Sequence, residues 1–172
     1  PDRDNVTHSD HARMNWWLYE RARPGLYSAI AKLSHVAAIA LVSNIVMPVR
    51  VPTGQVFSHA TAVFATDDLA DLALLSSAFH YWWTVTRAST MGVGAGIRYT
   101  PSDVFETFPR PISTGRMRTA GESLDNDRRI FMLSRELGLT KTYNLIHDPA
   151  VADSQVAHLR SLHAEVDAAV SA

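Results

Sequence analysis

The sequence predicts an α+β fold, in which a small mixed or antiparallel sheet packs with helices and is followed by a C-terminal helical appendix. β-Branched and apolar residues gather in three early runs, 36–42, 46–51 and 55–65, which is typical of strands. Later in the chain, apolar residues recur at spacings of three and four, which indicates helices. With 172 residues, 47% of them hydrophobic, the chain is long enough to bury a core.

Composition excludes several classes of protein. The chain has no cysteine, which excludes a disulfide scaffold, a thiolate metal site and a cysteine nucleophile, and which fits a reducing compartment. No apolar run approaches the roughly 20 residues that span a bilayer. We therefore expect a soluble, cytoplasmic protein.

Three segments are expected along the chain. Residues 1–14 are polar and lack periodicity, so we interpret them as a linker or an extension from an upstream domain. Residues 15–111 then form the α+β domain. Polar residues and two glycines from Ile112 to Gly121 mark a boundary, after which residues 112–172 form a helical tail. Because the first residue is proline, we expect the chain to be a piece of a longer polypeptide.

Start and stop signals place the helices of the first domain. A helix is expected from Pro24 to about Leu33, with proline in its first turn. Thr66 is expected to cap a second helix, which breaks near residues 76–77. The segment that follows, 79–87, is expected to bury its aromatic residues Phe79, Trp82 and Trp83.

Similar signals divide the tail. Ser123 is expected to cap a helix that runs to about Leu137 and ends at Gly138, and Thr140 is expected to cap a short helix through Ile146. The last helix carries an apolar stripe, which we interpret as a surface for docking on another domain or a second copy. The stripe consists of Val156, Leu159, His163, Val166 and Val170.

Charge is unevenly distributed although the formal net charge is only −1. The stretch from Arg21 to Thr66 contains no acidic residue, and neither does the stretch from Thr86 to Ser102. Such segregation predicts one basic face that could bind a phosphate backbone, and the alternative is that these cations are scattered over different faces. The basic residues in these two stretches are Arg21, Arg23, Lys32, Arg50, Arg87 and Arg98.

Motifs for catalysis or cofactor binding are weak. The glycines in residues 92–96 match neither a dinucleotide loop nor a phosphate loop, so we interpret this segment as a flexible loop. His8, Asp10 and His11 lack a further metal ligand, and His158 and His163 are five residues apart rather than four. No nucleophile elbow supports a Ser-His-Asp hydrolase. We expect no catalytic residue, cofactor or metal in this chain.

Arg98 and Tyr99 suggest a different chemistry. They follow the glycine-rich loop and precede a Thr-Pro-Ser-Asp turn, so a bidentate guanidinium lies beside an aromatic ring and hydroxyls. Such a group can hold a phosphate or contact the O6 and N7 edge of guanine. A structural arginine bonded to local carbonyl groups is the alternative.

A longer pattern resembles the C-terminal specificity region of large bacterial DNA methyltransferases. These are the MmeI-like and type IIG restriction-modification enzymes and related adenine-N6 methylases of phage-defence systems. The segment 94–109, which ends Phe105-Glu106-Thr107-Phe108-Pro109, resembles the close of their target-recognition domain. The other matching segments are Trp16-Trp17, residues 21–24, 41–44 and 55–58, and the tail from Leu145 to Pro149 and Leu162 to Asp167.

The resemblance implies a function in DNA recognition. The parent enzyme would use S-adenosylmethionine (SAM) and would either methylate DNA only or also cut it, whereas this chain lacks the methyltransferase and nuclease motifs. Its partners would be double-stranded DNA and the methyltransferase core of the same polypeptide. Expected DNA-facing residues are Arg21, Arg23, Lys32, Ser43, Asn44, Arg50, Arg87, Ser89, Thr90, Arg98 and Tyr99. The alternative is a protein-interaction or assembly module without DNA affinity of its own.

Overall fold

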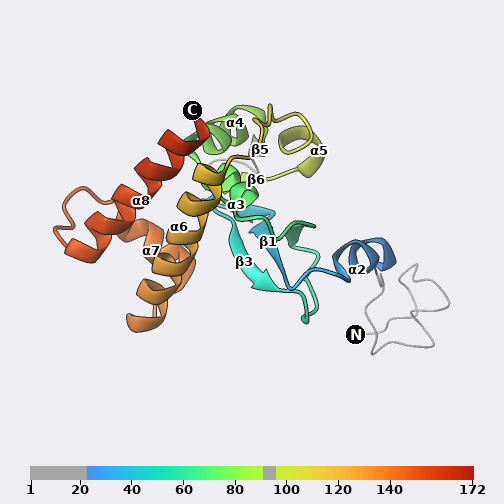
Figure 1. Cartoon of the computed structure of the whole chain (residues 1–172), viewed down its shortest axis with the longest axis horizontal. Coiled ribbons are helices and arrows are strands. Elements are labelled where there is room, and N and C mark those ends of the chain that lie inside the picture. Colours follow the sequence, from blue (N-terminus) through green and yellow to red (C-terminus); the bar gives the residue numbers. More distant parts are fainter. Residues whose placement is uncertain (1–22, 91–95) are drawn as a thin grey trace. The chain divides into compact units, whose positions relative to one another are not determined.

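The computed structural model describes residues 23–90 and 96–172, which contain seven helices and six short strands (Figure 1). The chain divides into two compact units, residues 1–32 and 33–172, and each is described by itself. In the first unit, the described residues form α2 (Pro24–Ile30). Proline occupies the first turn as expected, but the helix ends three residues before Leu33. The remaining elements all belong to the second unit.

The first sheet of this unit is antiparallel and has the strand order β3-β1-β4. It consists of β1 (His35–Ala40), β3 (Val49–Pro52) and β4 (Thr61–Phe64), and β1 lies in the centre. Residues 36–39 are buried on both faces of the sheet, which explains their continuous apolar run. The α+β class and the antiparallel sheet are therefore confirmed.

The strands are shorter than the sequence predicted. The run 36–42 is divided, because the chain leaves the first sheet after Ala40 and continues as β2 (Val42–Ser43) in another sheet. Pro48 precedes β3 instead of lying within it, and the proline that does belong to the strand, Pro52, ends it at the edge of the sheet, where a missing amide hydrogen is tolerated. Of the run 55–65, only the four residues of β4 are extended and paired.

The second sheet is small and antiparallel, with the strand order β2-β6-β5. Its other strands are β5 (Ser89–Thr90) and β6 (Ile97–Arg98). Gly96 makes the close approach of β6 possible, because a Cβ atom there would lie 2.7 Å from the backbone carbon of Ser43. Glycine is thus required where the chain enters this sheet.

Two helices follow the first sheet, and the predicted break between them is confirmed. Helix α3 (Leu69–Ser76) ends at Ser77, whose hydroxyl accepts a hydrogen bond from His80 N and so caps α4 (Ala78–Arg87). Thr66 is not the cap of α3 as predicted. That role belongs to Asp68, because its carboxylate accepts from Ala70 N while the Thr66 hydroxyl donates to Asp71.

The predicted starts of the tail helices are wrong. Helix α6 (Gly115–Ser134) begins eight residues before Ser123 and is capped by the Thr114 hydroxyl. Gly138 is the N-cap of α7 (Leu139–His147), a position predicted for Thr140. The chain already leaves α6 at residues 135–136, where Glu136 adopts a left-handed φ of 52°. The short helix α5 (Pro101–Val104) precedes all of these.

The tail helices pack onto the domain that precedes them. Helix α6 lies against α3, and Gly121 permits this contact because a Cβ atom there would lie 2.1 Å from the Leu69 carbonyl oxygen. Helix α8 (Ser154–Val170) packs against α6, α3 and α7, so its apolar stripe is part of this chain's own core. The stripe therefore does not remain as a surface for docking. The boundary predicted at residues 111–112 falls inside the second unit.

Candidate nucleic-acid interface

The side chain of Arg98 is exposed on the central strand of the β2-β6-β5 sheet. Its register partners are Val42 and Ser89. Directly opposed residues of antiparallel strands point to the same face, so one face of this sheet presents Val42, Arg98 and Ser89, all three exposed. Within residues 23–90 and 96–172, the guanidinium of Arg98 forms no hydrogen bond and no ion pair, and only its backbone is engaged, in the sheet. The guanidinium is therefore available to a ligand.

Tyr99 is not available, although the sequence placed it beside Arg98 in a site. The side chain is 1% exposed, and burial raises the pKa of its hydroxyl. That hydroxyl donates to His80 Nε2 at 3.0 Å, and His80 Nδ1 donates to the Leu75 carbonyl oxygen at 2.9 Å. Burial also lowers the pKa of His80 to about 4, which keeps the ring neutral. Tyr99 therefore supports the fold, and its buried side chain is not exposed at this face.

Arg87 lies in the last turn of α4, two residues before Ser89. Its guanidinium stacks on the Trp83 ring, 4.6 Å from the centroid, and it has no carboxylate partner among the described residues. Stacking of this kind holds the side chain in place and leaves the edge of the guanidinium free. Arg87 can therefore pair with a phosphate near the face that carries Arg98.

The other predicted site residues do not join this face. Ser43 points to the opposite side of the small sheet from Val42, and its hydroxyl accepts from Ile45 N. Arg50 lies on β3 of the other sheet, half-buried, and its Nε is buried with no hydrogen-bond partner. Asn44 is exposed in the turn after β2 and lines a separate cavity of about 500 Å³ with residues of α7 and α8.

For four of the predicted residues, the structure gives no side-chain position relative to this face. Arg23 and Lys32 belong to the first unit of the chain. Arg21 lies outside the described residues, as do the side chain of Thr90, the possible ligands His8, Asp10 and His11, and the glycines at 92 and 94. The predicted linker and the tryptophans at 16 and 17 lie there too.

Most arginines of the tail are occupied by structural contacts. Arg118 pairs with Asp68 at 2.8 Å, and Arg135 pairs with Asp153 at 2.7 Å. These arginines hold the pKa of both carboxyl groups below the usual range. Arg160 donates to four backbone carbonyl groups around the end of α7. Among the described residues, these three tail arginines are therefore held by contacts within the fold, whereas Arg87 and Arg98 have no carboxylate partner.

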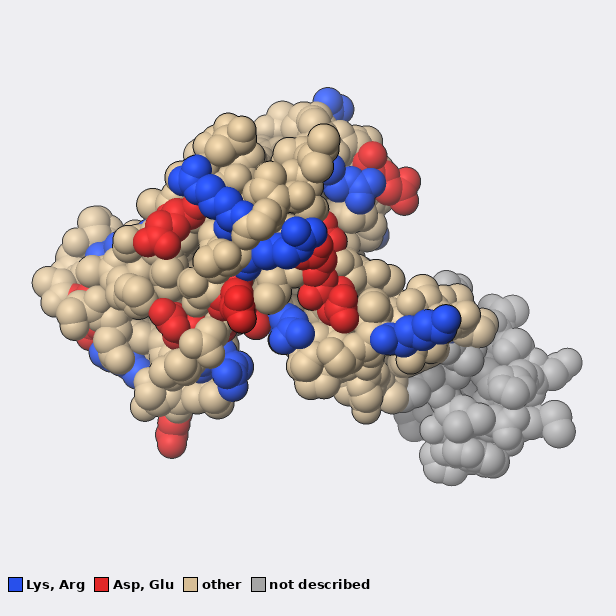
Figure 2. Space-filling view, in the orientation of Figure 1, with Lys and Arg blue, Asp and Glu red and all other residues tan. Residues whose placement is uncertain are grey.

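The face drawn in Figure 2 is not uniformly basic. Lysine and arginine side chains alternate there with aspartate and glutamate over the described part of the chain (Figure 2). A ligand with many phosphates would therefore meet repulsion as well as attraction over this face. On this face, contact with DNA would depend on a few cations rather than on a broad basic surface.

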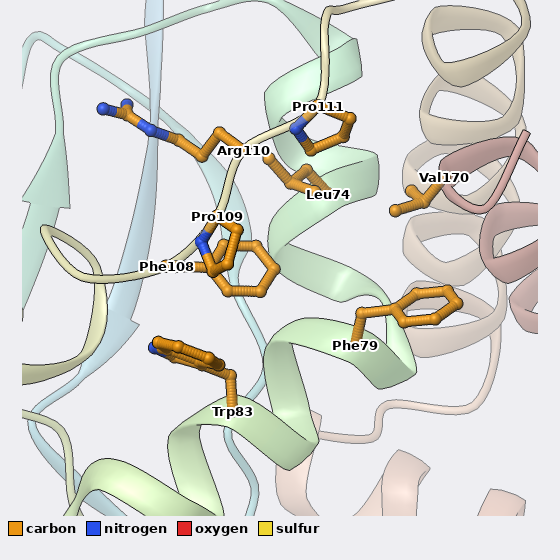
Figure 3. Close-up of a pocket in the computed structure, with 8 residues that line it drawn as sticks. All are labelled: Leu74, Phe79, Trp83, Phe108, Pro109, Arg110, Pro111 and Val170. Atoms are coloured by element: carbon orange, nitrogen blue, oxygen red, sulfur yellow. The ribbon is translucent and has the colours of Figure 1, made fainter.

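A second feature of the molecule is an apolar groove of about 520 Å³ beside α4. Figure 3 shows Phe79 and Trp83, from one helix, on either side of Phe108 and Pro109. Sequence reasoning missed this groove because it expected Phe79 and Trp82 to be buried, whereas they are 47% and 65% exposed. The three-residue spacing of Phe79, Trp82 and Val85 could have revealed an exposed apolar face. Leu74, Arg110, Pro111 and Val170 complete the lining.

Comparison with known proteins adds no relative. No family model matches the chain, and searches of the curated proteins and of the solved structures find no significant match. Among the described residues, no group of three or more histidines and carboxylates could hold a metal ion. Within the same residues, no helix is both long enough and apolar enough to cross a bilayer.

Proposed function

We propose that this chain is a DNA-recognition module of a larger bacterial SAM-dependent adenine-N6 methyltransferase that acts in restriction-modification or defence. The exposed, unpaired Arg98 on the central strand of the β2-β6-β5 sheet is the observation that supports the proposal most strongly. The likeness of residues 94–109 to the end of a target-recognition domain supplies the context. The methyltransferase core of the same cytoplasmic polypeptide would bind SAM.

In the proposed mechanism, Arg98 contacts a base edge and Arg87 contacts the DNA backbone. Arg98 extends from a strand that is paired on both sides, so its backbone is held while its guanidinium reaches outward. A guanidinium held in this way can donate two parallel hydrogen bonds to O6 and N7 of guanine. Arg87 and the Ser89 hydroxyl would contact the flanking phosphates and fix the register.

Measuring binding to duplex DNA at several salt concentrations tests this proposal. Arg98→Ala should weaken binding by about tenfold, which corresponds to the loss of one bidentate contact worth about 1–3 kcal/mol. Arg129→Ala is the matched control, because it removes the same charge from the exposed side of α6. Equal affinity of the two variants, or binding that does not change with salt, would count against DNA recognition.

The assembly module remains the second candidate, but on a different surface from the one the sequence suggested. The stripe of α8 is buried within the chain, whereas α4 exposes an apolar face.

A further inference from the structure

Helix α4 has its polar and apolar faces reversed relative to an ordinary surface helix. His80 and Thr84 are fully buried, and hydrogen bonds satisfy both, since the Thr84 hydroxyl donates to the His80 carbonyl oxygen. Phe79, Trp82 and Val85 are instead 47%, 65% and 40% exposed. An amphipathic helix normally turns its apolar stripe inward. Apolar side chains gathered on the outside indicate an interaction surface.

This surface contains both a protruding side chain and a groove that could receive it. Trp82 protrudes from α4, while Phe79 and Trp83 of the same helix line the groove of about 520 Å³. Figure 3 shows the rings and prolines of the lining gathered around this space, with the guanidinium of Arg110 directed away from them. That guanidinium stacks on Phe105 instead, 4.9 Å from the ring centroid. Among the described residues, no carboxylate lines the groove, so an indole would meet an almost wholly apolar lining.

We propose that the occupant of the groove is Trp82 of a second copy of this chain. In a two-fold symmetric dimer, each subunit presents the same patch, and a feature on one copy meets the complementary feature on the other. A patch that carries a protruding tryptophan next to an apolar groove meets this requirement. If two α4 helices cross at residues 82–83, the Trp82 indole of each copy can enter the groove of the other copy.

Charges at the ends of α4 set the direction of the pairing. The Asp167 carboxylate accepts from Ala78 N at 2.7 Å at the start of the helix, and Arg87 lies in its last turn. An antiparallel pair centred on residues 82–83 brings each Arg87 level with the partner's Asp167, whereas a parallel pair would place like charges side by side. Electrostatic complementarity therefore favours the antiparallel arrangement.

The expected dimer is weak. A tryptophan buries about 150–250 Å² when it is enclosed. Because Trp82 is already partly buried in the monomer, two indoles together with the exposed parts of Phe79 and Val85 fall short of the roughly 1,000 Å² expected of a stable specific contact, which is typical of a weak, transient one. We therefore expect a dissociation constant in the micromolar range and a measurable monomer fraction in dilute solution.

Sedimentation velocity of the full 172-residue chain, without DNA, tests the proposal. The wild type should shift from monomer to dimer as concentration rises, and Trp82→Ser should weaken association at least tenfold. Leu133→Ser is the control, because that leucine is 69% exposed on α6 and lies far along the chain from α4. Thermal unfolding followed by circular dichroism should show that both variants remain folded.

Two outcomes would overturn the proposal. The first is a wild type that stays monomeric at every concentration, which would leave the groove to a different molecule. The second is a dimer that Trp82→Ser leaves intact, because such a dimer would use another surface. Since DNA is absent from the experiment, neither outcome depends on the proposed recognition function.

Discussion

Acidification should destabilise the fold well above the pH range in which its carboxylates titrate. Burial lowers the pKa of His80 from 6.5 to about 4. It does the same to His163, where the charges of Arg128 and His147 also contribute. His163 Nε2 accepts from the Tyr143 hydroxyl at 2.9 Å, and that hydroxyl accepts from Arg128 at 3.1 Å. In the folded protein, Nε2 of each histidine already accepts a hydrogen bond from a tyrosine hydroxyl, so a second ring proton would disrupt that bond.

The sign and size follow from linkage between protonation and unfolding. Above about pH 6.5, both rings are neutral whether the chain is folded or not, so no stability is lost. As pH falls toward 4, the unfolded chain takes up protons that the folded chain does not, and the free energy of unfolding decreases. A difference of about 2.5 pKa units corresponds to about 3 kcal/mol for each histidine, complete once pH falls below about 4.

Urea unfolding followed by tryptophan fluorescence between about pH 7 and about pH 4.5 measures this loss. His163→Gln should remove about half of the pH dependence, because the amide oxygen can accept from Tyr143 but does not titrate. His59→Gln, at an exposed histidine, should leave the dependence unchanged. A wild-type free energy that stays constant over this range, or an equal effect of the two variants, would refute the reasoning.

Two further substitutions test the packing of the fold. Tyr99→Phe leaves the buried His80 Nε2 without its donor and should cost about 1–3 kcal/mol in urea unfolding, while DNA affinity should stay at the wild-type value. A loss of affinity without a loss of stability would instead make Tyr99 a binding residue. Gly121→Ala should cost about 1–3 kcal/mol or more, because its Cβ would overlap the Leu69 carbonyl oxygen. Gly115→Ala, in open space, should be neutral or slightly stabilising, and equal melting temperatures for the two alanine variants would contradict the close contact of α3 and α6.

The local signals of the sequence predicted the class of the fold and several of its turns. β-Branched runs located the strands of the first sheet, and Ser77 marked the break between α3 and α4, because such signals act over a few residues. Strand lengths and helix starts were less predictable. Thr66, Asp67 and Asp68 can all begin a helix, and only the folded backbone selects Asp68.

The candidate site shows why adjacency in sequence is a poor guide to a surface. Arg98 and Tyr99 are neighbours, yet the arginine at the end of β6 is exposed, whereas the tyrosine that follows the strand is buried in the core. The aromatic residues of α4 were expected inside because tryptophan is usually buried. His80 and Thr84 occupy the buried face instead, since each has a hydrogen-bond partner there. The sequence pattern does not predict those partners.

Mapping amide chemical shifts of the isotope-labelled chain during titration with duplex DNA tests the recognition account most directly. The account predicts that the largest changes fall on β2, β5, β6 and the last turn of α4, and that they weaken as salt is added. Changes concentrated on α6 and α7, or no changes at any DNA concentration, would contradict it.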